Sequence, residues 1–112
     1  MAKKNIYFKF EMLILVILTT KDCYGYEITT KIRELSDGII DIKEGSLYPT
    51  LYKMLDKGYI SSNEVIVNRK IRVYYHLEES GIPYLEAMIE EYHQWENKIQ
   101  VILNIKGEHG DE

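Results

Sequence analysis

Cysteine and histidine are scarce in this sequence. The 112 residues include one cysteine, Cys23, so an intrachain disulfide is excluded. The histidines are His76, His93 and His109, and they lack the close spacing of zinc ligands. No histidine lies near Cys23 in the sequence, and there is no glycine-rich loop of the kind that cradles phosphates. We therefore predict a protein that is not an enzyme and that needs neither a metal nor another cofactor.

Long apolar segments are also absent. The longest uninterrupted apolar run, residues 12–18, is bracketed by Glu11 and Lys21. It is far shorter than the roughly 20 residues that span a bilayer. The sequence therefore predicts a soluble, cytoplasmic protein with no membrane partner.

Positive charge is in deficit. The 14 lysines and arginines face 18 aspartates and glutamates, which gives a formal net charge of −4. Nonspecific affinity for nucleic acids comes from summed positive charge, so this balance argues against a protein that coats DNA or RNA indiscriminately. A DNA-binding function would require the positive charge to be concentrated on one part of the molecule.

The length suits one compact domain, although a chain of 112 residues is often stabilised further by a subunit interface. Residues 12–18 are apolar nearly all round a helix, and Phe8 and Phe10 precede them. This pattern indicates burial on more than one side, either in the core of the domain or against a second chain.

A second helix is predicted over residues 24–35, because Ile28, Ile32 and Leu35 are spaced for one inward stripe. Gly25 lies between two tyrosines near its start, where it would allow close approach of the backbone to a phosphate or to a neighbouring helix. We favour the packing interpretation. Cys23 is interpreted as a small, partly buried residue, since only Lys21 nearby could lower the pKa of its thiol.

Residues 46–57 predict a third helix with two different faces. We expect Ser46 to cap its start, Pro49 to lie in its first turn and Gly58 to end it. The apolar face has Leu47, Leu51, Met54 and Leu55, and the polar face has Ser46, Thr50, Lys53 and Lys57, with Tyr48 and Tyr52 at its border. Hydroxyls and lysines suit contact with a polyanion, so the hypothesis is a recognition helix. The alternative is an ordinary surface helix, as most amphipathic helices with two lysines are.

After Gly58 the apolar pattern changes from helical to alternating, which predicts a strand over residues 71–77 and a partner strand that includes residues 60 and 65–67. The turn between them is Asn68-Arg69-Lys70, with Arg72 close by, so the tip of the hairpin is basic. Three helices followed by a basic hairpin predict a mainly α (α+β) fold, the winged helix-turn-helix. The cations could also simply belong to a solvated turn.

From residue 78 onward the sequence predicts one long helix, whose start Pro83 confines to the neighbourhood of Glu79 or Ser80. Apolar residues there recur at intervals of three and four, which suits packing against a helix of a second copy. The expected dimer interface consists of Leu85, Met88, Ile89, Tyr92, Trp95, Ile99, Ile102 and Leu103. The same segment gathers acids at Glu78, Glu79, Glu86, Glu90, Glu91 and Glu96, away from the basic hairpin. We expect a DNA-binding domain over residues 1–77, a dimerisation helix over 78–105 and a frayed tail over 106–112.

Four segments together resemble one family. They are Tyr24-Gly25-Tyr26-Glu27-Ile28, residues 44–52 with Gly-Ser-Leu-Tyr-Pro, Lys57-Gly58-Tyr59-Ile60, and Arg72-Val73-Tyr74-Tyr75-His76-Leu77 before Ser80-Gly81. In this combination the chain resembles the PadR family of bacterial transcriptional regulators, in particular the short subclass with one long helix after the wing. The resemblance implies a homodimeric repressor that binds double-stranded DNA at a pseudo-palindromic operator. Unlike the usual family wing, the hairpin tip here has no glycine.

The resemblance also implies site residues. The recognition helix would present Ser46, Tyr48, Thr50 and Lys53 to DNA, Tyr24 would meet a phosphate, and the wing would supply Arg69, Lys70 and Arg72. A winged helix used only for protein interaction, without DNA binding, is the alternative function, because a fold alone does not establish DNA binding.

Trp95 resembles the tryptophan with which multidrug-responsive relatives hold flat aromatic ligands across the dimer axis. Two such rings would stack a planar compound, with Phe8 and Met12 as walls and Glu96 available to a cationic ligand. The alternative is that Trp95 only fills the dimer core.

Overall fold

Helix α1 (Phe10–Thr20) forms the centre of the computed structural model, which describes residues 8–108. It contacts α2 (Gly25–Leu35), α3 (Glu44–Lys57), α4 (Gly81–Asn104) and strand β3 (Lys70–Leu77). Its buried apolar residues are Met12, Ile14, Leu15, Ile17 and Leu18. This burial on several sides confirms the expectation from its apolar pattern, and it explains why so apolar a helix occurs in a small domain.

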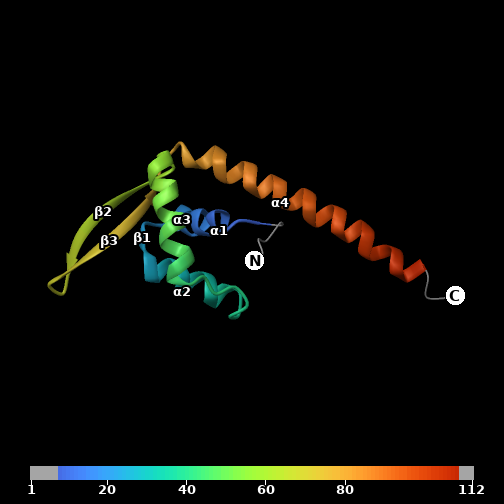
Figure 1. Cartoon of the computed structure of the whole chain (residues 1–112), viewed down its shortest axis with the longest axis horizontal. Coiled ribbons are helices and arrows are strands. Elements are labelled where there is room, and N and C mark those ends of the chain that lie inside the picture. The colour runs from blue at the N-terminus through green and yellow to red at the C-terminus, as the bar shows by residue number, and fades with distance from the viewer. Residues whose placement is uncertain (1–7, 109–112) are drawn as a thin grey trace.

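Helices α2 and α3 pack beside α1 and are joined by residues 36–43 (Figure 1). Ile28 and Ile32 bury the inward stripe of α2, but Leu35, predicted to complete it, is 73% exposed. Asp37 and Gly38, both with positive φ, follow the helix. Leu47, Leu51 and Met54 bury one face of α3, as their spacing predicts.

The predicted end of α3 is confirmed, but its predicted start is not. Gly58 adopts the left-handed conformation with φ of 80° and ends the helix, as expected. The prediction that Ser46 caps the start was wrong, because α3 already begins at Glu44. The Lys43 carbonyl accepts hydrogen bonds from the amides of Ser46 and Leu47, at 2.9 and 2.8 Å. Pro49 consequently lies one turn further into the helix than predicted.

The wing is the antiparallel pair of β2 (Ile60–Val67) and β3, with Ser62 opposite Tyr75. A short strand β1 (Cys23–Tyr24) pairs with the other edge of β3, so the order is β1-β3-β2. On β3 Tyr75 is buried and Val73 half-buried, whereas Ile71 near the tip is exposed. The helices and this sheet form a winged helix-turn-helix, which confirms the predicted fold class.

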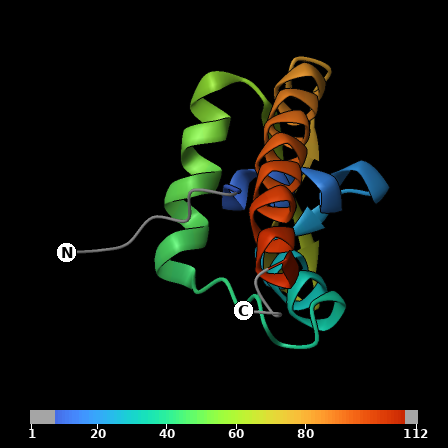
Figure 2. The ribbon, with the colours of Figure 1, turned by 90° about the vertical axis from the view of Figure 1, so that its right-hand side faces the viewer.

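Helix α4 runs from the base of the wing across α1 and then extends beyond the rest of the fold (Figures 1 and 2). Its first half buries Leu85 and Met88, whereas Ile102 and Leu103 in its last turns are 65% and 51% exposed. A 3-10 turn, η1 (Ile105–Glu108), follows it, and residues 109–112 of the predicted frayed tail lie outside the described residues. Among the helices of residues 8–108, none combines the length and the hydropathy that a membrane span requires.

Candidate nucleic-acid interface

The outer face of α3 is the first part of the candidate interface. Ser46 is exposed and Thr50 is half-buried, and neither lies in the apolar core. The Thr50 hydroxyl donates a hydrogen bond to the Ser46 carbonyl at 2.7 Å, so its proton is used within the helix while its oxygen can still accept. Tyr52, one turn after Tyr48, is 59% exposed on the same helix. This face can therefore offer small hydroxyls and an aromatic ring to a groove.

Tyr48 is shared between this face and the packing of α2 against α3. A Cβ atom added to Gly25 would lie 2.5 Å from the Tyr48 hydroxyl oxygen and 3.3 Å from a methyl carbon of Leu47. The absence of a side chain at Gly25 thus allows α3 to approach the start of α2, which confirms the packing interpretation of this glycine. Burial raises the pKa of the Tyr48 hydroxyl, so it stays a neutral donor at physiological pH.

Tyr24 and Arg72 are brought together beside β3, where the short strand β1 pairs with it. The guanidinium carbon of Arg72 lies 4.1 Å from the centre of the Tyr24 ring, a cation–π arrangement. The Tyr24 ring also meets Tyr74 edge-on, with 5.5 Å between ring centres, since these two residues are paired across β1 and β3. The Tyr24 ring therefore favours this position of the Arg72 guanidinium.

The wing tip consists of exposed residues Asn68, Arg69 and Lys70. Asn68 and Arg69 have φ values of 52° and 66°. A two-residue hairpin loop with positive φ at both positions matches the twist of the strands, and asparagine tolerates this conformation well. Arginine does not favour the left-handed conformation. The turn therefore forms without the glycine of the family pattern only at the cost of backbone strain at Arg69.

Lys53 differs from the other predicted DNA contacts because it forms an ion pair within the protein. Its ammonium nitrogen lies 3.1 Å from a carboxylate oxygen of Glu11, in the first turn of α1. The Lys53 side chain is 59% exposed, whereas that of Glu11 is only 6% exposed. Lys53 thus stands at the edge of α3 that faces α1.

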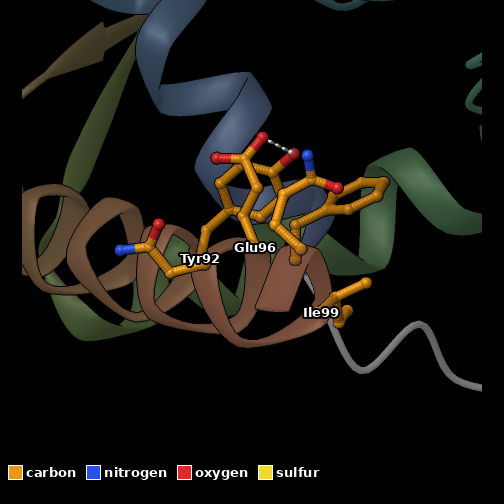
Figure 3. A pocket seen from close by; sticks show the side chains of 6 residues that line it. Tyr92, Glu96 and Ile99 are labelled. Carbon is orange, nitrogen blue, oxygen red and sulfur yellow. Dashed lines mark hydrogen bonds between the residues drawn. The ribbon is translucent and has the colours of Figure 1, made fainter. Parts of the chain in front are cut away.

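The candidate ligand residues do not come together within one chain. Phe8 and Glu96 line a hollow of about 420 Å³ together with Tyr92, Asn97, Ile99 and Gln100 (Figure 3). There the Tyr92 hydroxyl donates to the Glu96 carboxylate at 3.5 Å, a long and weak hydrogen bond. Met12 is buried and lines a separate apolar groove of about 280 Å³ between α1, α2 and α4. Trp95 lines a third hollow, of about 710 Å³, with Gln94, Lys98 and Val101.

The residues predicted for a dimer interface divide into two groups along α4. Leu85 and Met88 are buried in the chain's own core. Ile89, Tyr92 and Ile99 are half-buried, and Trp95, Ile102 and Leu103 are exposed. The predicted interface residues that the chain's own core leaves exposed therefore lie on the later turns of α4.

Some features of this region were not found from the sequence. The sequence places Tyr52 at the border of the polar face of α3, and its spacing of four from Tyr48 on the same helix is a signal for including it among the candidate contacts. In the sequence Glu11 is the polar end of an apolar run, yet in the structure it is buried. On β3 the His76 imidazole lies 2.7 Å from the Asp22 carboxylate, and this hydrogen bond raises the pKa of His76. Its partners are far apart in the sequence, so no local pattern could have shown it.

Comparisons with known proteins agree with this geometry. The model of the family described as "Transcriptional regulator PadR-like family" matches residues 14–87. A transcriptional regulator from Clostridium thermocellum is 35% identical, with a TM-score of 0.72, over 84% of this chain and 89% of the other. A PadR family transcription regulator from Clostridium difficile is 34% identical, with a TM-score of 0.71, over 83% and 96%. Bacillus subtilis PadR, whose structure is known in complex with operator DNA, is 29% identical, with a TM-score of 0.59, over 77% of this chain and 45% of the other.

Proposed function

Because the chain belongs to the PadR-like family of transcriptional regulators, we propose that it is a homodimeric repressor that binds a pseudo-palindromic DNA operator. The observation that carries the proposal is the opposite placement of two surfaces. The basic wing and the later turns of α4, which expose apolar side chains, project from opposite ends of the molecule (Figure 1). One end can thus meet DNA while the other joins two copies, although the net charge is −4.

The proposed DNA contacts come from α3 and the wing. Ser46, Tyr48 and Thr50 would approach a major groove from α3, and Arg69 and Lys70 would reach the adjacent backbone or minor groove from the wing tip. Arg72 would contact a phosphate from its place over the Tyr24 ring. The strained backbone of Arg69 supports a role for this side chain, since glycine would form the same turn without strain. Operator binding implies a cytoplasmic protein.

The wing provides the test of DNA binding. We expect Arg69→Gln and Lys70→Gln each to weaken binding to a duplex that the wild-type protein selects from a random-sequence pool. Each should flatten the slope of log affinity against log salt by about 0.9, because one phosphate contact is lost. Fluorescence anisotropy over a series of salt concentrations measures both quantities.

Lys98→Gln is the matched control for this test, because Lys98 is an exposed cation on α4, far along the chain from the wing. It removes the same charge and should leave the slope unchanged. Equal slopes for all variants would contradict the wing contacts. If the wild-type protein selects no duplex at low salt, the interaction-module function is favoured instead.

We further propose that a planar aromatic ligand binds between two copies and relieves repression. The hollow that holds Phe8 and Glu96 borders the later turns of α4, which carry the apolar residues proposed for the dimer interface. A second copy docked there would add its own Trp95 ring to these walls. The Glu96 carboxylate would favour a cationic ligand.

Fluorescence tests this site cleanly, because Trp95 is the single tryptophan of the sequence. Titration with the planar cation ethidium, without DNA, is expected to quench Trp95. Trp95→Ala should weaken ethidium binding by about tenfold, since one ring–ring stack per copy is lost. Absence of quenching, together with equal ethidium binding by Trp95→Ala, would show that Trp95 serves packing only.

A further inference from the structure

The carboxylate of Glu11 connects three helices. Glu11 lies in the first turn of α1 and is 5% exposed. One of its oxygens accepts a hydrogen bond from the hydroxyl of Tyr84 in α4. The other lies 3.1 Å from the ammonium nitrogen of Lys53 in α3. Both oxygens of this buried acid are therefore satisfied, one by a neutral donor and one by a cation.

The surroundings of Glu11 hold this arrangement in place. The Tyr84 ring stacks on Tyr59, with 4.1 Å between ring centres and 14° between the planes. Burial, together with the hydrogen bond to Glu11, raises the pKa of Tyr84, so its hydroxyl remains protonated and continues to donate. Lys57 and Met54 complete the lining of the small hollow in which these groups meet.

Lys53 can satisfy either Glu11 or a DNA phosphate, and the two partners differ in solvation. Withdrawal of Lys53 would leave a buried carboxylate oxygen without its cation, which is strongly unfavourable in a poorly solvated site. A phosphate contact at the edge of α3 would be exposed to water and screened by salt. The buried carboxylate is consequently the stronger competitor for Lys53.

We propose that Glu11 is a positioning residue for DNA recognition, because it holds the Lys53 ammonium against the protein and removes it from the cations that contact phosphate. This inference rests on the proposed DNA-binding function. It assigns Lys53 a role in joining α1, α3 and α4, and it leaves the phosphate contacts of the recognition surface mainly to the wing.

Glu11→Gln tests the inference, since glutamine keeps the shape of the side chain and an oxygen that can accept from Tyr84. We expect Lys53 to be released, so that affinity for the selected duplex rises and the salt slope steepens by about 0.9. Compared with the control variant Glu86→Gln, the gain in affinity should be roughly 3.5-fold larger at about 50 mM than at about 200 mM salt. Adding Lys53→Ala to Glu11→Gln should abolish the gain, whereas Lys53→Ala alone should leave the slope nearly unchanged.

Two further variants separate this effect from its alternatives. Glu86→Gln, at an exposed acid on α4, makes the same change in net charge and should not alter the slope. Tyr84→Phe removes a hydrogen bond of Glu11 but keeps the Lys53 pair, so it should also leave the slope unchanged, even if it lowers the melting temperature.

The contrary outcomes are distinct. Equal slopes for Glu11→Gln and Glu86→Gln, a steeper slope for Tyr84→Phe, or a loss of about one unit for Lys53→Ala alone would each overturn the role of Glu11 while DNA binding stands. Failure of the wild-type protein to bind any duplex would instead overturn the proposed function, and this inference with it.

Discussion

Replacement of both Ile99 and Leu103 by glutamate is expected to convert the protein from a dimer of twice 13.2 kDa into a 13.2-kDa monomer. The affinity for the operator should fall by roughly 100-fold or more, because each half-site would then bind independently. Light scattering measures the mass, and anisotropy with the selected duplex measures the affinity.

The reason lies in the spacing of residues along α4. Ile99 and Leu103 continue the stripe that begins with Leu85, Met88 and Tyr92, at intervals of three, four and seven residues. Leu85 and Met88 are buried in the chain's own core, whereas Leu103 is 51% exposed. Two carboxylates placed on this stripe would have to be desolvated in any interface that covers it.

A matched control places two charges on the opposite face of α4. Gln94→Glu with Val101→Glu makes the same change in net charge, and Val101 is itself 60% exposed. This double variant should remain dimeric and keep its affinity to within a few-fold. If the wild-type protein is already a monomer, or if both double variants dissociate alike, the proposed interface is wrong.

Gly81→Ala is expected to lower the free energy of unfolding by about 3 kcal/mol, near the upper end of the usual cost of overpacking. The added Cβ would lie 2.5 Å from the carbonyl oxygen of Tyr59 and 2.8 Å from a methyl carbon of Leu77. Because the first of these atoms belongs to the backbone, it cannot move aside as a flexible side chain could.

The surrounding hydrogen bonds make this junction rigid. The Glu78 amide donates to the same Tyr59 carbonyl at 3.0 Å, and the Ser80 hydroxyl donates to the Gly58 carbonyl at 2.6 Å. Together they hold the start of α4 against the end of α3. A methyl group at Gly81 would therefore have to displace the junction of the wing, α3 and α4.

Gly45→Ala serves as the control for this prediction, because an added Cβ there meets no atom within 4 Å. In a helix it should leave stability unchanged or raise it by up to about 1 kcal/mol. Urea unfolding followed by circular dichroism measures both variants. An unfolding midpoint of Gly81→Ala equal to that of the wild-type protein would contradict the close contact.

Local patterns predicted most of the fold. Helical spacing predicted the buried face of α3, alternation predicted the β2–β3 pair, and a glycine after a helix predicted the left-handed end at Gly58. The sequence predicts too late a start for α3, because Ser46 is a good capping residue by type. In the structure the backbone of Lys43 already starts the helix.

Contacts between distant residues could not be predicted in this way. Strand β1 has two residues, too few for any periodicity, and it exists because β3 pairs with it about 50 positions later. The hydrogen bond from Tyr84 to Glu11 spans 73 positions, so no local pattern could indicate that this acid is buried. Two of the candidate DNA contacts, Tyr24 and Arg72, form a cation–π pair, whereas Lys53 forms an ion pair with the buried Glu11.

In our proposal this acidic chain binds DNA because two copies join at their apolar ends and present their basic ends together. The most direct measurement is native mass spectrometry of the wild-type protein on its selected duplex, combined with footprinting of the same complex. We expect two protomers for each duplex and two protected half-sites whose centres are about 10 base pairs apart. One 13.2-kDa protomer on a single, isolated half-site would contradict it.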